Sequence, residues 1–125
     1  NFEKVTGIEV NANSIHWANA NAVVNHVENA DFFVGRSEAI FMKIDYEPET
    51  TAVIIDPPRR GCDQKFINQL VTFSPVKVIY VSCNPATQIR DLELFLAHDY
   101  RISCVQPFDL FPHTRHIENI VTLIK

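Results

Sequence analysis

Hydrophobic and polar positions along the chain follow two alternating periodicities. Short apolar stretches predict strands over residues 5–10, 30–34, 51–55, 76–82, 100–105 and 119–124. Apolar positions at helical spacing predict helices over residues 12–27, from Asp63 and after Asn84, with a weaker helix over residues 37–43. Strands that alternate with helices indicate an α/β fold with a mostly parallel sheet covered on both faces. The last two strands have no helix between them, so we expect an antiparallel C-terminal edge.

The same pattern predicts which residues are buried and where helices begin. The stretch over residues 51–55 is continuously apolar, which is typical of a strand buried on both faces. The expected buried positions of the two later helices are Phe66, Ile67, Leu70 and Val71, then Ile89, Leu92 and Leu96. Asn11 or Asn13 is expected to cap the first helix, and Asn84-Pro85 to begin the last one.

Three chemically unusual residues follow predicted strands: Glu9, Asp56 and Cys83. Ligands of parallel α/β sheets bind outside the carboxyl ends of the strands, so these residues are candidates for a site. A Gly-rich turn after a first strand is absent, and Glu9 stands where the acidic residue after a second strand is expected. We therefore expect residues 1–125 to form one partial domain, a C-terminal fragment of a longer protein that lacks the N-terminal part of the fold.

Composition narrows the class of protein. The 125 residues are 46% hydrophobic, and no apolar run approaches the roughly 20 residues of a membrane span, so we expect a soluble, intracellular protein of the cytoplasm or nucleus. Three widely spaced cysteines make a disulfide framework or structural zinc unlikely. The net charge of −4 argues mildly against nucleic-acid binding by this domain alone, yet it is compatible with a local basic patch.

Each candidate residue has a functional and an ordinary interpretation. Glu9 is either a ligand of the ribose hydroxyls of a nucleoside cofactor or an exposed carboxylate. Asp56, held by the two prolines that follow it, either orients a planar base or a cofactor amino group or simply ends a strand. Cys83 lies before a helix N-terminus, where the helix dipole favours a thiolate, but a small buried residue is the alternative.

The segment over residues 111–118 is the densest polar cluster. It has three interpretations: a metal site formed by His113, His116 and Glu118, a loop that delivers Glu118 as a general base, or a solvated loop without a role.

Three segments in this order resemble one family. Residues 55–61 (IDPPRRG), 81–87 (VSCNPAT) and 111–118 (FPHTRHIE) resemble signatures of the RNA uracil-C5 methyltransferases, which make 5-methyluridine in tRNA and bacterial ribosomal RNA. Residues 61–66 (GCDQKF) look most like the fungal enzymes that act on the T-loop of tRNA. The resemblance implies a Rossmann-like methyltransferase fold, S-adenosylmethionine as cofactor, tRNA as substrate and no metal.

The resemblance also implies a role for each site residue. Cys83 matches the nucleophile, and Glu118 matches the base that abstracts a proton. Glu9 matches the acid that binds the cofactor ribose, Asp56 lies where cofactor and base meet, and Arg36 is near the adenine. The implied reaction is addition of the cysteine to C6 of a flipped-out uracil, methylation at C5 and removal of the C5 proton.

Two rival functions remain. Methyltransferases that act on amino groups also use Asp-Pro-Pro motifs, without a cysteine nucleophile. A non-catalytic RNA-binding module would keep the Rossmann-like fold without the cofactor loop. A dinucleotide dehydrogenase gains no support from Cys83 and Glu118. Arg59, Arg60 and Arg115 are either phosphate contacts or surface arginines.

Overall fold

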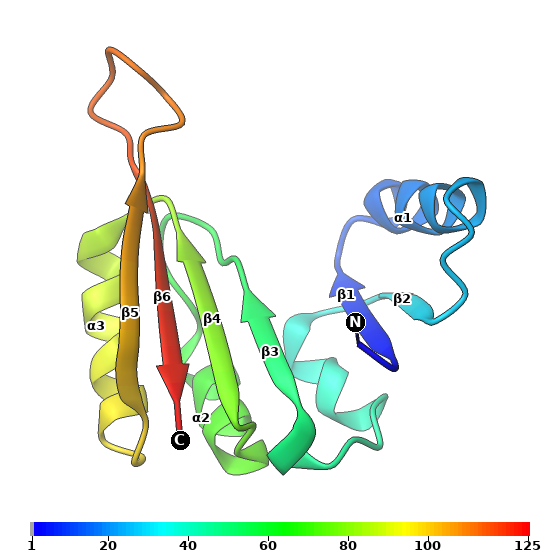
Figure 1. Ribbon diagram of the computed structural model, residues 1–125, viewed down its shortest axis with the longest axis horizontal. Helices are drawn as coiled ribbons and strands as arrows, with labels where there is room; N and C mark the ends of the chain where they lie inside the picture. The colour runs from blue at the N-terminus through cyan, green and yellow to red at the C-terminus, as the bar shows by residue number, and fades with distance from the viewer. Residues whose placement is uncertain (1) are drawn as a thin grey trace. The chain divides into compact units, whose positions relative to one another are not determined.

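A computed structural model describes residues 2–125, which divide between Asp45 and Tyr46 into two compact units, residues 2–45 and residues 46–125. Each unit is built from strands and helices in alternation, so the α/β class is confirmed (Figure 1). Within the described range, no helix combines the length and the apolar character that crossing a bilayer requires.

The first unit is a β–α–β element followed by a short 3₁₀ helix. Strand β1 (Val5–Glu9), helix α1 (Ala12–Val24) and strand β2 (Ala30–Val34) are followed by η1 (Ser37–Met42). The two strands are parallel, with Glu9 opposite Val34. Asn11, rather than Asn13, caps α1, because its side chain accepts hydrogen bonds from the backbone of the first turn. The helix ends before the predicted residue 27, since His26 adopts a left-handed conformation with φ 55°.

The second unit carries a four-stranded mixed sheet. Its elements are η2 (Pro48–Thr50), β3 (Ala52–Ile55), α2 (Gln64–Phe73), β4 (Lys77–Ser82), α3 (Pro85–Leu96), β5 (Arg101–Phe108) and β6 (Glu118–Ile124). The strand order is β3-β4-β6-β5, with β3 and β4 parallel and β6 antiparallel to both of its neighbours. The predicted antiparallel C-terminal pair is confirmed, but of these two strands only β5 lies at an edge of the sheet, and β6 lies inside it.

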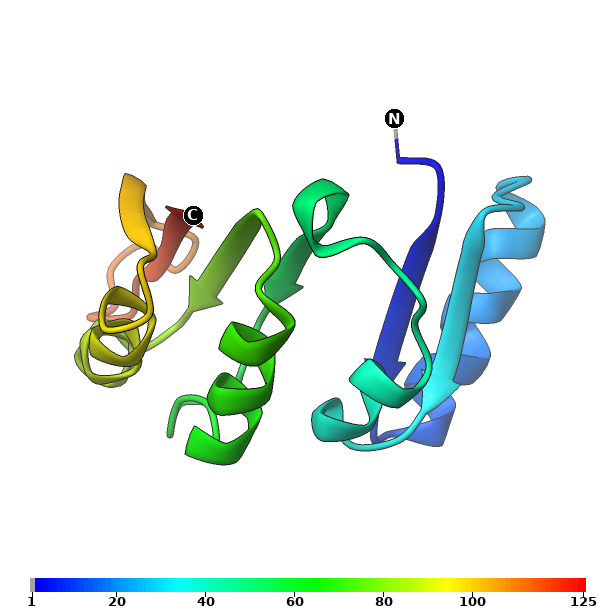
Figure 2. The ribbon, with the colours of Figure 1, turned by 90° about the horizontal axis from the view of Figure 1, so that it is seen from below.

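Helices α2 and α3 both lie on one face of this sheet (Figures 1 and 2). Within this unit the two helices therefore cover one face of the sheet, and Ile54 of β3 is 66% exposed. Successive right-handed crossovers that advance in one direction place their helices on the same face. On the covered face, Val78 and Tyr80 of β4 and Leu123 of β6 are completely buried.

The two helices differ in how well the sequence predicts their buried faces. Asp63 caps α2, and all four of its predicted apolar positions are buried. In α3, Leu92 is buried as expected, whereas Ile89 and Leu96 are 62% and 47% exposed. The face that α3 buries consists of Gln88, Asp91, Leu92 and Phe95. Two polar residues occupy this face because their side chains form hydrogen bonds there.

Strand β5 is exposed along its whole length. Its pairing with β6 contains a register shift between Ile102 and Cys104, and Pro107 lies opposite Asn119 near its end. Both features belong to an edge strand, since a bulge and a proline each interrupt the row of backbone hydrogen-bonding groups.

Candidate active site

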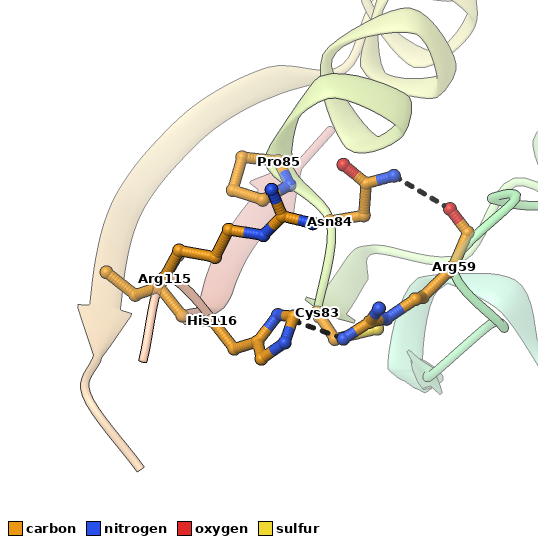
Figure 3. Close-up of a pocket in the computed structure, with 7 residues that line it drawn as sticks. Arg59, Cys83, Asn84, Pro85, Arg115 and His116 are labelled. Carbon is orange, nitrogen blue, oxygen red and sulfur yellow. Dashed lines mark hydrogen bonds between the residues drawn. The ribbon is translucent and has the colours of Figure 1, made fainter. Parts of the chain in front are cut away.

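Cys83 stands between the end of β4 and the start of α3. The next residue, Asn84, caps the helix through its side chain, which accepts from the backbone N–H of Ala86 at 3.3 Å, and Pro85 occupies the first turn. Cys83 is half-buried and lines a cavity of about 240 Å³ (Figure 3). The remaining lining residues are Arg59, Asn84, Pro85, Arg115, His116 and Ile117.

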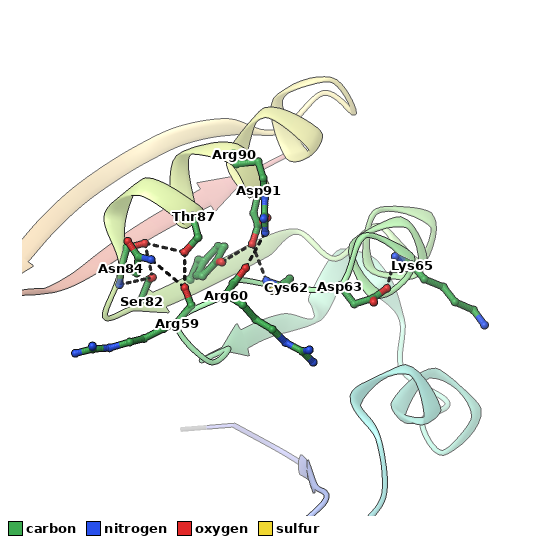
Figure 4. Close-up of polar contacts among 11 residues, drawn as sticks. Arg59, Arg60, Cys62, Asp63, Lys65, Ser82, Asn84, Thr87, Arg90 and Asp91 are labelled. Carbon is green, nitrogen blue, oxygen red and sulfur yellow. Dashed lines mark hydrogen bonds and ion pairs between the residues drawn. The ribbon is translucent and has the colours of Figure 1, made fainter.

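The segment after β3 is fixed to the first turn of α3. Its chain reverses through a turn in which Gly61 N–H donates to the carbonyl of Pro58 at 2.8 Å. The carbonyl of Arg59 accepts from the side chains of both Asn84 and Thr87, each at 3.0 Å (Figure 4). The exposed Asp56 begins this segment. Because β3 and β4 are parallel, Asp56 and Cys83 follow the same edge of the sheet.

A buried carboxylate, Asp91 of α3, holds the other end of the same segment. Its Oδ2 accepts from the Cys62 N–H and from the Tyr80 hydroxyl, both at 2.7 Å, and its Oδ1 accepts from Arg90 Nη2 at 2.6 Å (Figure 4). Gly61 fits beside it with φ 82°, in a space where a Cβ atom would lie 2.5 Å from Asp91 Oδ2. Each of these bonds satisfies a polar group that burial would otherwise penalise.

Burial also determines the state of two groups in this cluster. Loss of water contact is the main cause that raises the pKa of the Cys62 thiol to about 12. Burial, followed by the hydrogen bond to Asp91, raises the pKa of Tyr80 well above its usual range. Cys62 therefore stays a neutral thiol near neutral pH, which favours a structural role over a nucleophilic one.

The loop between β5 and β6 contributes the opposite wall of the cavity. A turn joins Phe111 to Thr114, whose N–H donates to the Phe111 carbonyl at 3.1 Å, and His113 within it has φ 66°. His116 follows, with its Nδ1 3.0 Å from Nη2 of Arg59 (Figure 3). This contact links the β5–β6 loop to the segment that begins at Asp56.

Glu118 is the first residue of β6 and is half-buried. The antiparallel register of β4 and β6 pairs Ser82 with Asn119, so Cys83 and Glu118 are the next residues of the two strands at the same end. Glu118 does not line the cavity of Cys83, although its neighbour Ile117 does. Among residues 2–125, no three His, Cys, Asp or Glu side chains gather as metal ligands, which leaves the metal interpretation of His113, His116 and Glu118 without support.

The other two predicted site residues belong to the first unit. Glu9 ends β1, and its Oε1 accepts the N–H of Asn11 at 2.8 Å. The N–H of Gly35 donates to the Glu9 carbonyl at 2.9 Å, so Arg36 also follows this edge of the strands. Arg36 forms an exposed ion pair with Glu38 at 3.3 Å. A backbone hydrogen bond and then Arg36 lower the pKa of Glu38.

The predicted site residues thus fall into one group in each unit: Glu9 with Arg36, and Asp56 with Cys83 and Glu118. The buried polar side chains that hold the second group were not among the residues predicted from the sequence. Gln88 and Asp91 recur at the helical spacing of Leu92 and Phe95. This shared spacing is the sequence signal that could have placed both polar residues on the buried face of α3.

Known proteins resemble nearly the whole chain. The family model described as tRNA (Uracil-5-)-methyltransferase matches residues 1–125. The tRNA (uracil(54)-C(5))-methyltransferase of Schizosaccharomyces pombe is 47% identical over 99% of the chain, and that of Saccharomyces cerevisiae is 45% identical over 94%. These matches span 24% and 19% of the two fungal proteins.

A solved structure agrees with these sequence matches. The Pyrococcus abyssi tRNA (uracil-54, C5)-methyltransferase, in complex with S-adenosyl-L-homocysteine, superposes with a TM-score of 0.81 and 34% identity over 97% of this chain and 29% of its own. The Rossmann-like methyltransferase fold expected from the resemblance is thereby confirmed. By sequence and by structure alike, the chain belongs to the tRNA (uracil-5-)-methyltransferase family.

Proposed function

We propose that the protein containing this chain transfers a methyl group from S-adenosylmethionine to C5 of a uridine in the T-loop of tRNA, giving 5-methyluridine. The observation that carries the proposal is the register of β4 and β6, which brings Cys83 and Glu118 to adjacent strand ends. A nucleophile and a base are the two groups that C5 methylation through a covalent adduct requires. The names of the fungal and archaeal relatives support the same substrate.

The residues of the chain fit the proposed cofactor. Glu9 presents an exposed carboxylate whose position at the end of β1 is fixed by the Asn11 N–H, which suits a ligand of ribose hydroxyls. We assign Asp56 to the junction of cofactor and target base, and Arg36 to the neighbourhood of the adenine. Because Arg36 pairs with Glu38, its contact with the cofactor is the least direct of the three. S-adenosylmethionine supplies an electrophilic methyl group when bound.

The proposed chemistry begins at Cys83. C5 of uracil is a weak nucleophile, so the Cys83 thiolate first adds to C6, and the electron pair of the C5–C6 double bond becomes available at C5. Once C5 carries the methyl group, Glu118 removes the remaining C5 proton. The electrons of that C–H bond restore the double bond, and the C6–S bond breaks to release the thiolate.

The proposed substrate reaches Cys83 from the surface. C6 of a stacked uracil is inaccessible, so the target nucleotide leaves its stack and enters the pocket. Arg59 and Arg115 line the cavity beside Cys83, and Arg60 is exposed on the same segment as Arg59. These arginines are suited to RNA phosphates, and they form a local basic patch despite the net charge of −4.

We also propose that residues 1–125 form part of a single catalytic domain of a longer, intracellular protein, cytoplasmic or nuclear. A single family model matches both units, and tRNA modification is an intracellular activity. The chain spans 24% and 19% of the two fungal relatives it matches. We therefore propose that parts of the longer protein outside residues 1–125 also bind the RNA.

A covalent trapping experiment tests this function. The full-length protein is mixed with S-adenosylmethionine and tRNA transcribed with 5-fluorouridine, whose C5 fluorine cannot leave as a proton. We expect a protein–RNA band on a denaturing gel that Cys83→Ser abolishes and the control Cys104→Ser, on the exposed strand β5, retains. With ordinary tRNA, Glu118→Gln is expected to accumulate the adduct, whereas Glu93→Gln on α3 is not.

The other functions predict different results. Methylation of an amino group would leave activity intact in Cys83→Ser and would yield no adduct. A non-catalytic RNA-binding module would bind tRNA without binding S-adenosylmethionine, which calorimetry would reveal. Either result would overturn the proposed function.

A further inference from the structure

The buried side chain of Gln88 and the half-buried side chain of Asn119 form an amide pair between helix α3 and strand β6. Gln88 is 1% exposed. Its Oε1 accepts from Asn119 Nδ2 at 2.7 Å, and its Nε2 donates to the carbonyls of Asn119 at 3.2 Å and Tyr80 at 3.0 Å. One glutamine side chain therefore joins the helix to two adjacent strands, β4 and β6, at the end of the sheet where Cys83 follows β4 and Glu118 begins β6.

The two ends of this connection lie next to the proposed catalytic residues. Gln88 N–H bonds to the carbonyl of Asn84, the residue after Cys83, at 3.1 Å. Asn119 directly follows Glu118. Successive side chains of a strand point to opposite faces, so the contact of Asn119 with α3 directs Glu118 toward the face opposite the helices.

From this geometry we infer that Gln88 and Asn119 are positioning residues for the proton-removing step of the proposed reaction. The inference rests on the proposed function and assigns a specific step to the pair. With Asn119 held at both its side chain and its carbonyl, the backbone beside Glu118 has a fixed orientation. When Glu118 takes the C5 proton, the electrons of the C5–H bond restore the C5–C6 double bond. The C6–S bond to Cys83 then breaks and releases the thiolate. An error of about 1 Å in a group that takes part in one step is enough to slow that step about a hundredfold.

The test separates this step from those before it. The full-length wild type, Gln88→Met and Asn119→Met are given tRNA containing uridine labelled with tritium at C5, together with S-adenosylmethionine. Methyl incorporation reports addition and methyl transfer, and tritium release reports proton removal. For both variants we expect tritium release to slow at least about tenfold, methyl incorporation in a single turnover to change less than about threefold, and the covalent adduct to accumulate on ordinary tRNA.

Gln69→Met is the matched control. Gln69 is a half-buried glutamine of α2, and its Oε1 is buried without a hydrogen-bond partner in the described part of the chain. The same substitution there removes an amide from the same helical layer without touching β6. We expect it to leave the ratio of tritium release to methyl incorporation unchanged.

A second substrate, tRNA containing 5-fluorouridine, tests the inference even if the variants are less stable than the wild type. Adduct formation with 5-fluorouridine tRNA requires Cys83 and methyl transfer but no proton removal. We expect Gln88→Met and Asn119→Met to form this adduct at the wild-type rate. Parallel loss of adduct formation and tritium release would show that the pair only stabilises the fold, and no change in either would show that it does not position Glu118; both results overturn the inference. Failure of the wild type to form the adduct would instead refute the proposed function.

Discussion

Arg59 and His116 are joined by a hydrogen bond of 3.0 Å from the guanidinium Nη2 to the imidazole Nδ1. A guanidinium only donates, so Nδ1 of His116 is the acceptor in this bond. The bond connects two loops that are 57 residues apart in the sequence, and both residues line the cavity beside Cys83 (Figure 3).

Loss of this bond is expected to weaken productive RNA binding. In His116→Leu of the full-length protein, the two loops lose a contact worth about 1 kcal/mol, so the KM for tRNA should rise roughly fivefold. The affinity for S-adenosylmethionine, measured by calorimetry, should not change. His116→Asn keeps an acceptor near the position of Nδ1 and should retain most of the activity. Equal defects in both variants would contradict the role of this acceptor.

Gly61→Ala is expected to destabilise the segment that follows β3. An alanine there would have φ 82° and would place its Cβ 2.5 Å from Asp91 Oδ2 and 2.6 Å from Arg90 Nη2. The strained backbone and the displaced Asp91 should together lower the free energy of unfolding by about 2 kcal/mol or more. Urea unfolding followed by circular dichroism measures this change in the full-length protein.

Gly35→Ala provides the comparison. Its Cβ would lie 3.2 Å from the flexible end of Ile8, and no positive φ is required there. We expect a loss of less than about 1 kcal/mol. Similar losses at the two glycines would refute the explanation given for Gly61.

Alkaline pH is expected to destabilise the protein through the thiol of Cys62 and the phenols of Tyr80 and Tyr100, whose pKa values are all raised by burial. Burial raises the pKa of Cys62 from 9.0 and that of Tyr100 from 10.0, each to about 12. Between pH 9 and 12 the unfolded chain has lost protons that the folded chain retains. The stabilisation is therefore complete below about pH 9 and is lost as the pH rises toward 12.

Urea unfolding at pH 8, 9, 10 and 11 under reducing conditions measures this dependence. Cys62→Ala should flatten the decline between pH 9 and 10, where the unfolded thiol titrates before the phenol. Cys104→Ala, which alters an exposed thiol, should leave the slope as it is. A stability that stays constant from pH 8 to 11 would contradict the burial effect.

Much of the fold could be predicted from the sequence because local patterns determine it. The strand over residues 30–34 and the burial of Phe66, Ile67, Leu70 and Val71 are confirmed. The placement of β6 between β4 and β5 could not be predicted, since strand order depends on long-range packing. Which face of the sheet α2 and α3 cover depends in the same way on the path of two crossovers.

The sequence was enough to predict the candidate site residues, but not the buried side chains that hold them in place. Cys83 and Asp56 could be located because each follows an apolar strand, and Asn84 was identified as a cap. Gln88 and Asp91 were missed because a hydrophobic pattern counts polar residues as exposed. Their burial depends on partners from other elements, such as Asn119, that no local pattern reveals.

The interruptions of strand β5 affect how the protein behaves at high concentration. An open sheet edge is a template on which another chain can add a strand, and repeated addition leads to aggregation. The register shift between Ile102 and Cys104 breaks the regular spacing of this edge, and Pro107 has no backbone N–H to offer. Arg101 adds a charge at the start of the strand. A strand that is exposed along its whole length and carries apolar residues is thereby a poor seed for intermolecular sheets at this edge.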